Sequence, residues 1–321
     1  MSQQISFASL AYQQKKKVTR REQFLNEMDQ CVPWSIMLRL IEPVYPKSGQ
    51  GRHPMPLPMM LRIYYMQQWF QLSDPGMEDA LYDSDTMRRF AGIELGQDAV
   101  PDETTILNFR HLLEMHDLTK EIFTAVQGYL EERGLMLRRG TIMDATIITA
   151  PSSTKNQERE RDPDMSSTKK GNQWYFGMKA HIGVDTRHGL VHTVVCTTAS
   201  EHDSKERDEL LHGDEREIYG DKAYANEEKR LECRSLGIAW RVTIKAKRGQ
   251  VLSERDKDWN RSRSRVRARV EHPFGVVKNL WGYRKVRYRG ITKNAGQCFS
   301  LFALANIYLV RRLLPKLKLA V

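Results

Sequence analysis

Apolar residues recur along the first 135 residues with the spacing of amphipathic helices. Residues 57–72 are apolar almost all round, which predicts a buried helix. Helical patterns follow over 73–93 and 100–134, each beginning at a residue suited to cap a helix. The short connections are compatible with a DNA reader of the helix-turn-helix type, although simple packing explains most helix pairs as well. We therefore expect residues 1–135 to form an all-α region.

From residue 140 the pattern changes to β-branched segments. Residues 140–151 (GTIMDATIITAP) predict a buried strand, and residues 174–200 predict two strands joined by a turn at DTRHG. The polar segment between them, 152–173, is expected to be a mobile loop. The other expected elements are a helix within 201–213, a short strand ending at Asp221, a helix over 227–236, a strand over 240–245, a helix around Glu271 that Pro273 interrupts, and a closing helix over about 293–313. This order predicts a mixed α/β domain over 136–321.

Charge indicates the class of partner. The chain has a formal net charge of +11, and residues 241–293 contain 17 Lys or Arg against four acids. A positive field of this density favours a polyanion such as nucleic acid. An anionic membrane is the competing partner, but the segment lacks the continuous apolar face of an interfacial helix. The N-terminus shows no signal-peptide pattern and no apolar run is long enough to cross a bilayer, so we expect a cytosolic protein without a membrane partner.

Metal-binding patterns based on cysteine or histidine are weak. The four cysteines are far apart and lack the spacing of a zinc site. His181, His188 and His192 fall around the DTRHG turn without a matching acid, so we expect them to be solvated turn residues.

Three acids stand out instead. Asp144 lies in the middle of the first strand, Asp221 ends a later strand, and Glu271 stands among five arginines upstream and Lys278 downstream. Glu271 could simply pair with Arg267 at i,i+4 on a solvated helix. If the two strands are neighbours, however, Asp144 and Asp221 meet at one edge, and a helix across that edge can deliver Glu271. Three such carboxylates would repel unless divalent cations join them, and two Mg²⁺ or Mn²⁺ ions suit oxygen ligands and in-line displacement at phosphorus.

These segments also carry a family resemblance. GTIMDATIIT, IYGDKAY and RARVEHPFGVVK resemble the three acidic regions of bacterial insertion-sequence DDE transposases, in the group of insertion sequence family five and its relatives, whose last region reads Tyr-x2-Arg-x3-Glu-x6-Lys. Arg267, Glu271 and Lys278 match that spacing, whereas Ser264 stands at the Tyr position. Residues from about 55 to 115 resemble the family's N-terminal domain.

The resemblance implies an RNase H-like mixed sheet flanked by helices, preceded by an all-α region for DNA binding and dimerisation. It implies that Asp144, Asp221 and Glu271 are the catalytic residues and metal ligands. It also implies that Arg267 and Lys278 bind phosphates near the element end. Further DNA-binding candidates are Arg263, Arg265, Lys222, Lys169 and Lys170; Lys222 is expected to contact phosphate or solvent, and the loop holding Lys155, Lys169 and Lys170 either orders on DNA or is a solvated linker. The 50 residues between Asp221 and Glu271 leave no room for a large inserted domain.

The function implied is a transposase that binds terminal inverted repeats, cleaves the ends and joins the freed 3′-hydroxyls to target DNA with two metal ions. Synapsis of two ends implies a homodimer or larger assembly on DNA. The resemblance places the protein in the bacterial cytoplasm, associated with the nucleoid through DNA. Two alternatives stay open from the residues: a metal-dependent nuclease of the same fold without strand transfer, and a catalytically silent DNA-binding regulator in which the acids form structural ion pairs.

Overall fold

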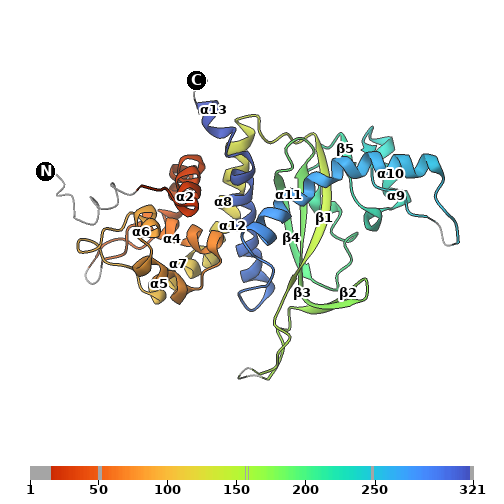
Figure 1. Ribbon diagram of the computed structural model, residues 1–321. Coiled ribbons are helices and arrows are strands. Elements are labelled where there is room, and N and C mark those ends of the chain that lie inside the picture. The colour runs from red at the N-terminus through yellow and green to blue at the C-terminus, as the bar shows by residue number, and fades with distance from the viewer. Residues whose placement is uncertain (1–15, 50–52, 156, 158, 247–248, 319–321) are drawn as a thin grey trace.

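The computed structural model describes residues 16–49, 53–155, 157, 159–246 and 249–318. The segment on which the signal-peptide expectation rests lies largely outside these ranges. A lobe of helices is followed across Figure 1 by the paired helices α8 (Leu118–Glu131) and α12 (Ile291–Val310), and then by a twisted sheet. The main apolar core contains residues of the helical lobe, of α12 and of the sheet. Residues on both sides of position 135 therefore share one core. No helix in the described ranges combines the length and hydropathy needed to cross a membrane.

The helical lobe is built from short helices, and side-chain hydrogen bonds cap the N-termini of α2, α5, α6 and α7. Those before α8 are α2 (Arg20–Cys31), α3 (Trp34–Ile41), α4 (Leu57–Phe70), α5 (Asp74–Asp83), α6 (Asp85–Ala91) and α7 (Glu103–Met115). The predicted buried helix is α4, in which ten of 14 residues are buried. The pattern over 73–93 is two helices, because the Ser84 hydroxyl accepts from the Met87 N–H and starts α6. The pattern over 100–134 also divides, at Asp117, whose φ is +49°.

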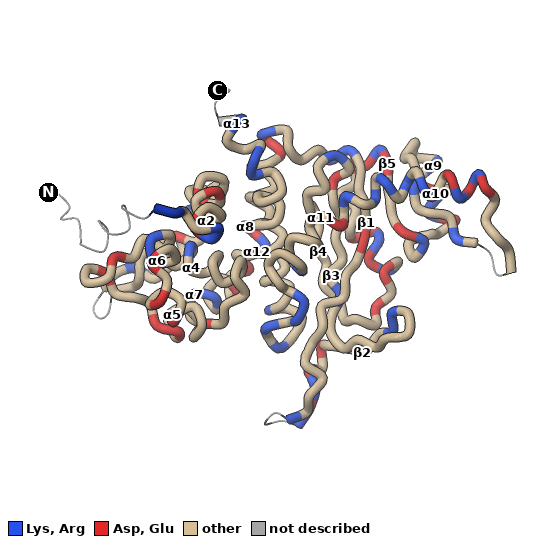
Figure 2. Tube along the Cα trace, viewed as in Figure 1, with Lys and Arg blue, Asp and Glu red and all other residues tan. Residues whose placement is uncertain are grey.

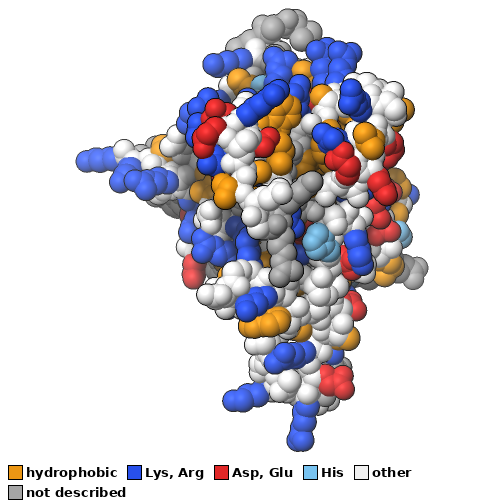
Figure 3. Space-filling view, turned by 90° about the vertical axis from the view of Figure 1, so that its right-hand side faces the viewer, with side chains coloured by type: hydrophobic (Ala, Val, Ile, Leu, Met, Phe, Trp, Pro, Cys, Tyr) orange, Lys and Arg blue, Asp and Glu red, His pale blue; other side chains and the backbone are white. Residues whose placement is uncertain are grey.

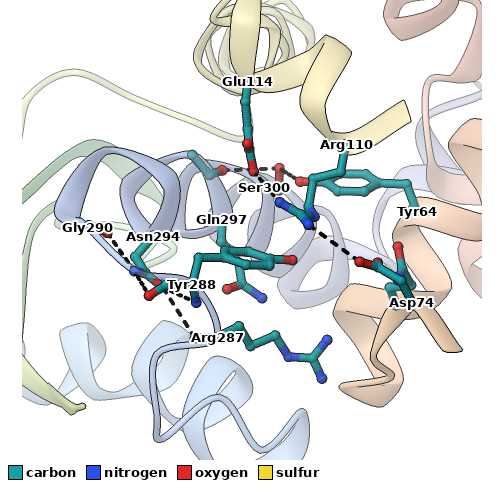
Figure 4. Close-up of polar contacts among 12 residues, drawn as sticks. Tyr64, Asp74, Arg110, Glu114, Arg287, Tyr288, Gly290, Asn294, Gln297 and Ser300 are labelled. Carbon is teal, nitrogen blue, oxygen red and sulfur yellow. Dashed lines mark hydrogen bonds and ion pairs between the residues drawn. The ribbon is translucent and has the colours of Figure 1, made fainter. Parts of the chain in front are cut away.

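A polar network joins this lobe to the chain just before α12 (Figure 4). The Arg110 guanidinium on α7 donates to Glu114 at 2.8 Å and pairs with Asp74 at 3.4 Å. It also lies 4.2 Å from the ring centre of Tyr288. Only 8% of the Arg110 side chain is exposed, so the two carboxylates compensate a nearly buried cation. The network fixes the helical lobe against the C-terminal part of the chain.

The sheet follows from the predicted strands and one unpredicted strand. Its members are β1 (Gly140–Thr149), β2 (Ser166–Lys170), β3 (Gln173–Asp185), β4 (Val191–Thr198), β5 (Glu217–Tyr219) and β6 (Ala239–Trp240). The order β4-β3-β1-β5-β6 has antiparallel β4, β3 and β1 and parallel β1, β5 and β6, while β2 pairs with the start of β3. This is the arrangement of an RNase H-like sheet, and the predicted fold class is confirmed.

Helices cover the sheet. Helix α12 packs against α8 and β4, and the Asn306 side chain exchanges two 2.7 Å hydrogen bonds with the backbone of Val191. Helices α9 (Glu227–Ser235) and α10 (Glu254–Arg267) lie at the other end of the sheet (Figure 1). The closing helix predicted over about 293–313 is thus α12, and its buried face holds the sheet against the helical lobe.

Three predicted elements are wrong. The segment 152–173 is not simply a loop, because its last five residues before the turn form β2. The helix predicted within 201–213 is only the 3₁₀ turn Asp208–Leu210, because Lys179 fixes the chain instead by donating to the Glu201 carbonyl. The strand predicted over 240–245 ends at Trp240, and beyond it the Asn260 side chain takes both hydrogen bonds of the Ile244 backbone.

The histidine prediction is also wrong for two of the three residues. His181 lies within β3 with no exposed surface, His192 lies within β4 with 7% exposed, and His188, in the turn, is half-buried. Burial lowers the pKa of His181 to about 4 and that of His192 to about 3. These two histidines are neutral packing residues of the sheet at neutral pH.

Candidate active site

Asp144 lies in the middle of β1, and Asp221 lies just after β5 at the matching position of the neighbouring parallel strand. The β1–β5 register runs from Gly140 opposite Glu217 to Ile142 opposite Tyr219, and each aspartate follows two residues after that last pair. Burial raises the pKa of Asp144 to about 6, and the negative charges of Asp221 and Asp203 add to the shift. The Ala145 N–H, which donates at 2.8 Å, and the Arg267 guanidinium act in the opposite direction. The register thus places Asp144 and Asp221 at the same level of two neighbouring strands.

Asp221 also begins a short 3₁₀ helix, Lys222–Tyr224, and accepts from the Ala223 N–H at 2.8 Å. Tyr224 is fully buried, and its hydroxyl has no hydrogen-bond partner in the described part of the chain. Burial raises its pKa, and the charges of Asp203, Asp144 and Asp221 raise it further. The Tyr224 hydroxyl therefore lies near all three acids.

Asp203 is a third acid at this edge that sequence reasoning missed. It lies on the segment after β4, where Lys179 donates to its carboxylate at 2.8 Å. The nearest nitrogen of buried His181 is 4.0 Å away. In the sequence Asp203 stands in a run of alternating charges that is typical of a solvated helix. Its place among the acids is recognisable only from its contact with Lys179 of β3 in the structure.

Glu271 lies on a helical segment that runs along β1. This segment passes from α10 through a 3₁₀ turn (Ala268–Val270) and α11 (Glu271–Phe274) into a π-helix (Gly275–Leu280). The predicted interruption around Pro273 thus takes the form of a change in helical winding, because proline cannot donate to the regular ladder.

Two cations attach this segment to β1 on either side of Glu271. An Arg267 Nη2 lies 3.9 Å from Asp144 Oδ2, and Lys278 Nζ donates to the Thr146 hydroxyl and the Ile147 carbonyl, both at 2.9 Å. Glu271 is one turn after Arg267 and so lies on a neighbouring part of the same helix face. Its side chain is exposed and has no hydrogen-bond or ion-pair partner in the described part of the chain. The structural Arg267–Glu271 pair considered from the sequence is absent there, because Arg267 turns toward Asp144.

The donor chemistry at this edge suits a divalent cation. Asp144 and Asp221 supply carboxylate oxygens from neighbouring strands, and burial, followed by the charges of Asp221 and Asp203, raises the pKa of Asp144. Within the described ranges, no group of three His, Cys, Asp or Glu side chains converges closely enough to hold a metal ion. Of the predicted trio, Glu271 is the residue with an exposed side chain. Asp144 and Asp221 are of the ligand type that such an ion prefers, and Glu271, the third predicted ligand, lies on the adjoining helix.

The predicted DNA-binding residues lie in three places. Lys222 and Arg267 line a hollow of about 530 Å³ together with Asp221 and Ser264. Arg263 stacks on Trp259 at 3.7 Å from the ring centre, and Arg265 is exposed one residue after Ser264. Lys169 and Lys170 are exposed on β2, and Lys155 is exposed on the loop before it. The structure thus brings Lys222 and Arg267 beside Asp221, and it brings Lys170 of β2 to a second hollow that Lys278 also lines.

Basic positions recur along α10, at the β2 turn and in the segment before α12 (Figure 2). The face seen from the side of α9 and α10 shows Lys and Arg side chains scattered over it, together with acids and apolar groups (Figure 3). This distribution agrees with the polyanion partner expected from the sequence.

Family models match both parts of the chain. The model described as "Transposase DDE domain" matches residues 136–307, and the model described as "Transposase domain (DUF772)" matches residues 12–112. Among solved structures, the piggyBac transposase synaptic complex with hairpin DNA is similar at 10% identity and a TM-score of 0.41, covering 92% of this chain and 77% of that chain. The Mos1 strand transfer complex is similar at 15% identity and a TM-score of 0.26, covering 95% of this chain and 98% of that one.

Proposed function

The chain belongs to the transposase DDE domain family, and from that premise we propose that it is an insertion-sequence transposase that cuts element ends and joins them to target DNA. The family makes it a DDE transposase acting on DNA, an enzyme class that uses divalent metal ions. The proposed subgroup is that of insertion sequence family five. The spacing of Arg267, Glu271 and Lys278 supports it, and so do the contacts of both cations with β1.

The observation that carries the proposal is the point where β5 ends beside the middle of β1. Asp144 and Asp221 lie at matching positions there, and the helix of Glu271 runs alongside. We propose that these three acids hold two Mg²⁺ or Mn²⁺ ions. When bound, such ions lower the pKa of water and stabilise the charge that develops on a phosphate in transfer.

The protein's own groups position the DNA. Arg267 and Lys222, in the hollow beside Asp221, neutralise the scissile phosphate and its neighbour. In the first step a water oxygen bonds to phosphorus, the P–O3′ bond breaks, and the 3′ oxygen leaves with a proton. In the second step that 3′-hydroxyl oxygen bonds to a target phosphorus and displaces the target's own 3′ oxygen.

Substrate and assembly are part of the same proposal. The helical lobe binds terminal inverted repeats, and two copies hold the two ends during synapsis. Since transposition acts on the element's own DNA, we place the protein in the bacterial cytoplasm with the nucleoid.

The test is an in vitro reaction with duplex DNA that spans the element's own end, in Mg²⁺ or Mn²⁺, with cut positions mapped. The proposal expects a nick at the 3′ end of the element and joined products when precut ends meet target DNA. Asp144→Ala and Asp221→Ala should abolish both steps, while replacement of the exposed Asp214 with Ala should keep them. Cutting without joining would favour the nuclease. Cutting by Asp144→Ala would contradict the assignment of that residue.

A further inference from the structure

The unpredicted strand β2 forms a narrow projecting hairpin with the start of β3 (Figure 1). Lys170 pairs with Gln173, so the turn consists of Gly171 and Asn172, and the φ of +63° at Gly171 suits glycine. The base of the hairpin is fixed, because the Ser166 hydroxyl accepts from the Ser200 N–H at 2.7 Å. Lys170, Gly171 and Asn172 at the tip are all exposed. A hairpin with a fixed base and an exposed tip can contact a partner molecule.

One face of the hairpin presents an aromatic ring. Trp174 lies opposite Lys169 and is 67% exposed, whereas the chain's other five tryptophans are buried or half-buried. An exposed aromatic ring beside a cation can stack on a nucleic acid base. Its exposure has no role in packing the fold.

The opposite face is a cationic hollow. Lys170 and Tyr175 line a space of about 470 Å³ together with Lys278 and Arg284, and no acidic side chain lines it. Burial lowers the pKa of Lys278, and the charges of Lys170 and Arg284 lower it further. Three cations gathered without a lining carboxylate leave room for an anion such as a DNA phosphate.

This hollow adjoins the active site. It includes Thr146, which accepts from Lys278 and lies two residues after Asp144 on the same side of β1. Alternate residues of a strand are about 7 Å apart, so the hollow begins about 7 Å from Asp144 along β1. A strand held in the hollow can therefore continue directly past Asp144.

We propose that the β2–β3 hairpin is a wedge that separates the two DNA strands beside the scissile phosphodiester. The backbone of one strand occupies the hollow of Lys170, Lys278 and Arg284. An unpaired base of the other strand stacks on Trp174, next to Lys169. This inference rests on the proposed function for the position of the cut. The two faces of the hairpin support the proposal separately. The hollow fits a DNA backbone, and Trp174 needs an unpaired base for stacking, which a fully paired duplex does not offer.

A binding experiment tests the stacking without chemistry. The probes are a duplex with a short mismatched bubble and the same duplex fully paired, both in EDTA, because stacking on an aromatic ring tolerates any base sequence. Trp174→Ala should bind the bubble about 5- to 150-fold more weakly than wild type. Trp174→Phe should stay near wild type, and so should Leu236→Ala, which removes an exposed apolar side chain directly after α9. Equal binding of the bubble by Trp174→Ala and wild type would overturn the proposal, as would an equal loss on both probes.

A cleavage experiment tests the wedge. Trp174→Ala should cut a paired element end more slowly than wild type, and an end with mismatches beside the cut should restore its rate. An unchanged rate on the paired end, or failure of the mismatches to restore the rate, would contradict strand separation by the hairpin. If the wild type cut neither end, the proposed function would fail, while the bubble-binding result would still decide the role of Trp174.

Discussion

Replacing Asp144 with Asn should make the protein more stable at neutral pH. The pKa of this carboxyl is raised from 3.8 to about 6, and the first cause is burial. The folded state therefore binds the proton more tightly than the unfolded state. As a result, ionised Asp144 lowers stability progressively as the pH rises from about 4 to about 6. Asn cannot ionise, yet its amide oxygen can still accept from the Ala145 N–H.

The magnitude follows from the shift. Two pKa units correspond to about 3 kcal/mol, and allowance for the 23% exposure of the side chain reduces this to about 2 kcal/mol. The gain of Asp144→Asn over wild type should be near zero at pH 4 and reach its full value at pH 7. Saturating Mg²⁺ should raise the stability of the wild type and reduce the gain of the variant, because the ion binds the folded carboxylate.

Urea unfolding followed by circular dichroism between pH 4 and pH 8 measures this difference. Asp79→Asn, on the exposed face of α5, is the matched control and should show no gain. A variant less stable than wild type at pH 7, or a gain that is the same at pH 4 and pH 7, would refute the argument that burial places Asp144 under electrostatic strain.

Three further predictions concern the site and its support. Glu271→Gln should reduce end cleavage by at least about 100-fold, because Glu271 is proposed to bind the metal ions. Glu228→Gln, at an exposed position on α9, should cleave at the wild-type rate. A wild-type rate for Glu271→Gln would show that Glu271 is not a metal ligand. Asp203→Asn should reduce cleavage about 10- to 100-fold, because Asp203 and Lys179 set the charge around Asp144, and it should leave end binding unchanged in a gel-shift assay. Asp214→Asn, at an exposed position, is the control. Equal cleavage by the two variants would make Asp203 structural. Arg110→Met should lower the free energy of unfolding in urea by about 3–5 kcal/mol, since Asp74 and Glu114 would lose their shared cation. Arg39→Met, at an exposed position, should change it little. Similar stability of the two variants would contradict the importance of the network.

The sequence predicts those parts of the site that depend on strand pattern and local spacing. Asp144 is recognisable because a carboxylate interrupts a β-branched run, and the pairing of β1 with β5 then brings Asp221 to the same edge. The helix of Glu271 is recognisable from its basic pattern, although the exposure of the Glu271 side chain is not.

Other parts depend on tertiary contacts that no local pattern contains. Asp203 joins the acids only because Lys179 reaches across from β3. The segment containing β2 has the composition of a loop, and it forms a strand because the long β3 extends beyond β4 and offers a free edge there. His181 and His192 flank the predicted turn closely enough to suggest exposure, but the strands extend far enough to bury both.

The most direct test of the central claim is a crystal structure of the protein with its element end and Mn²⁺, in which anomalous scattering locates the ions. The account predicts two Mn²⁺ ions held among Asp144, Asp221 and Glu271, beside the scissile phosphate. Ions located elsewhere, or a Glu271 side chain that stays out of coordinating reach with DNA bound, would contradict it.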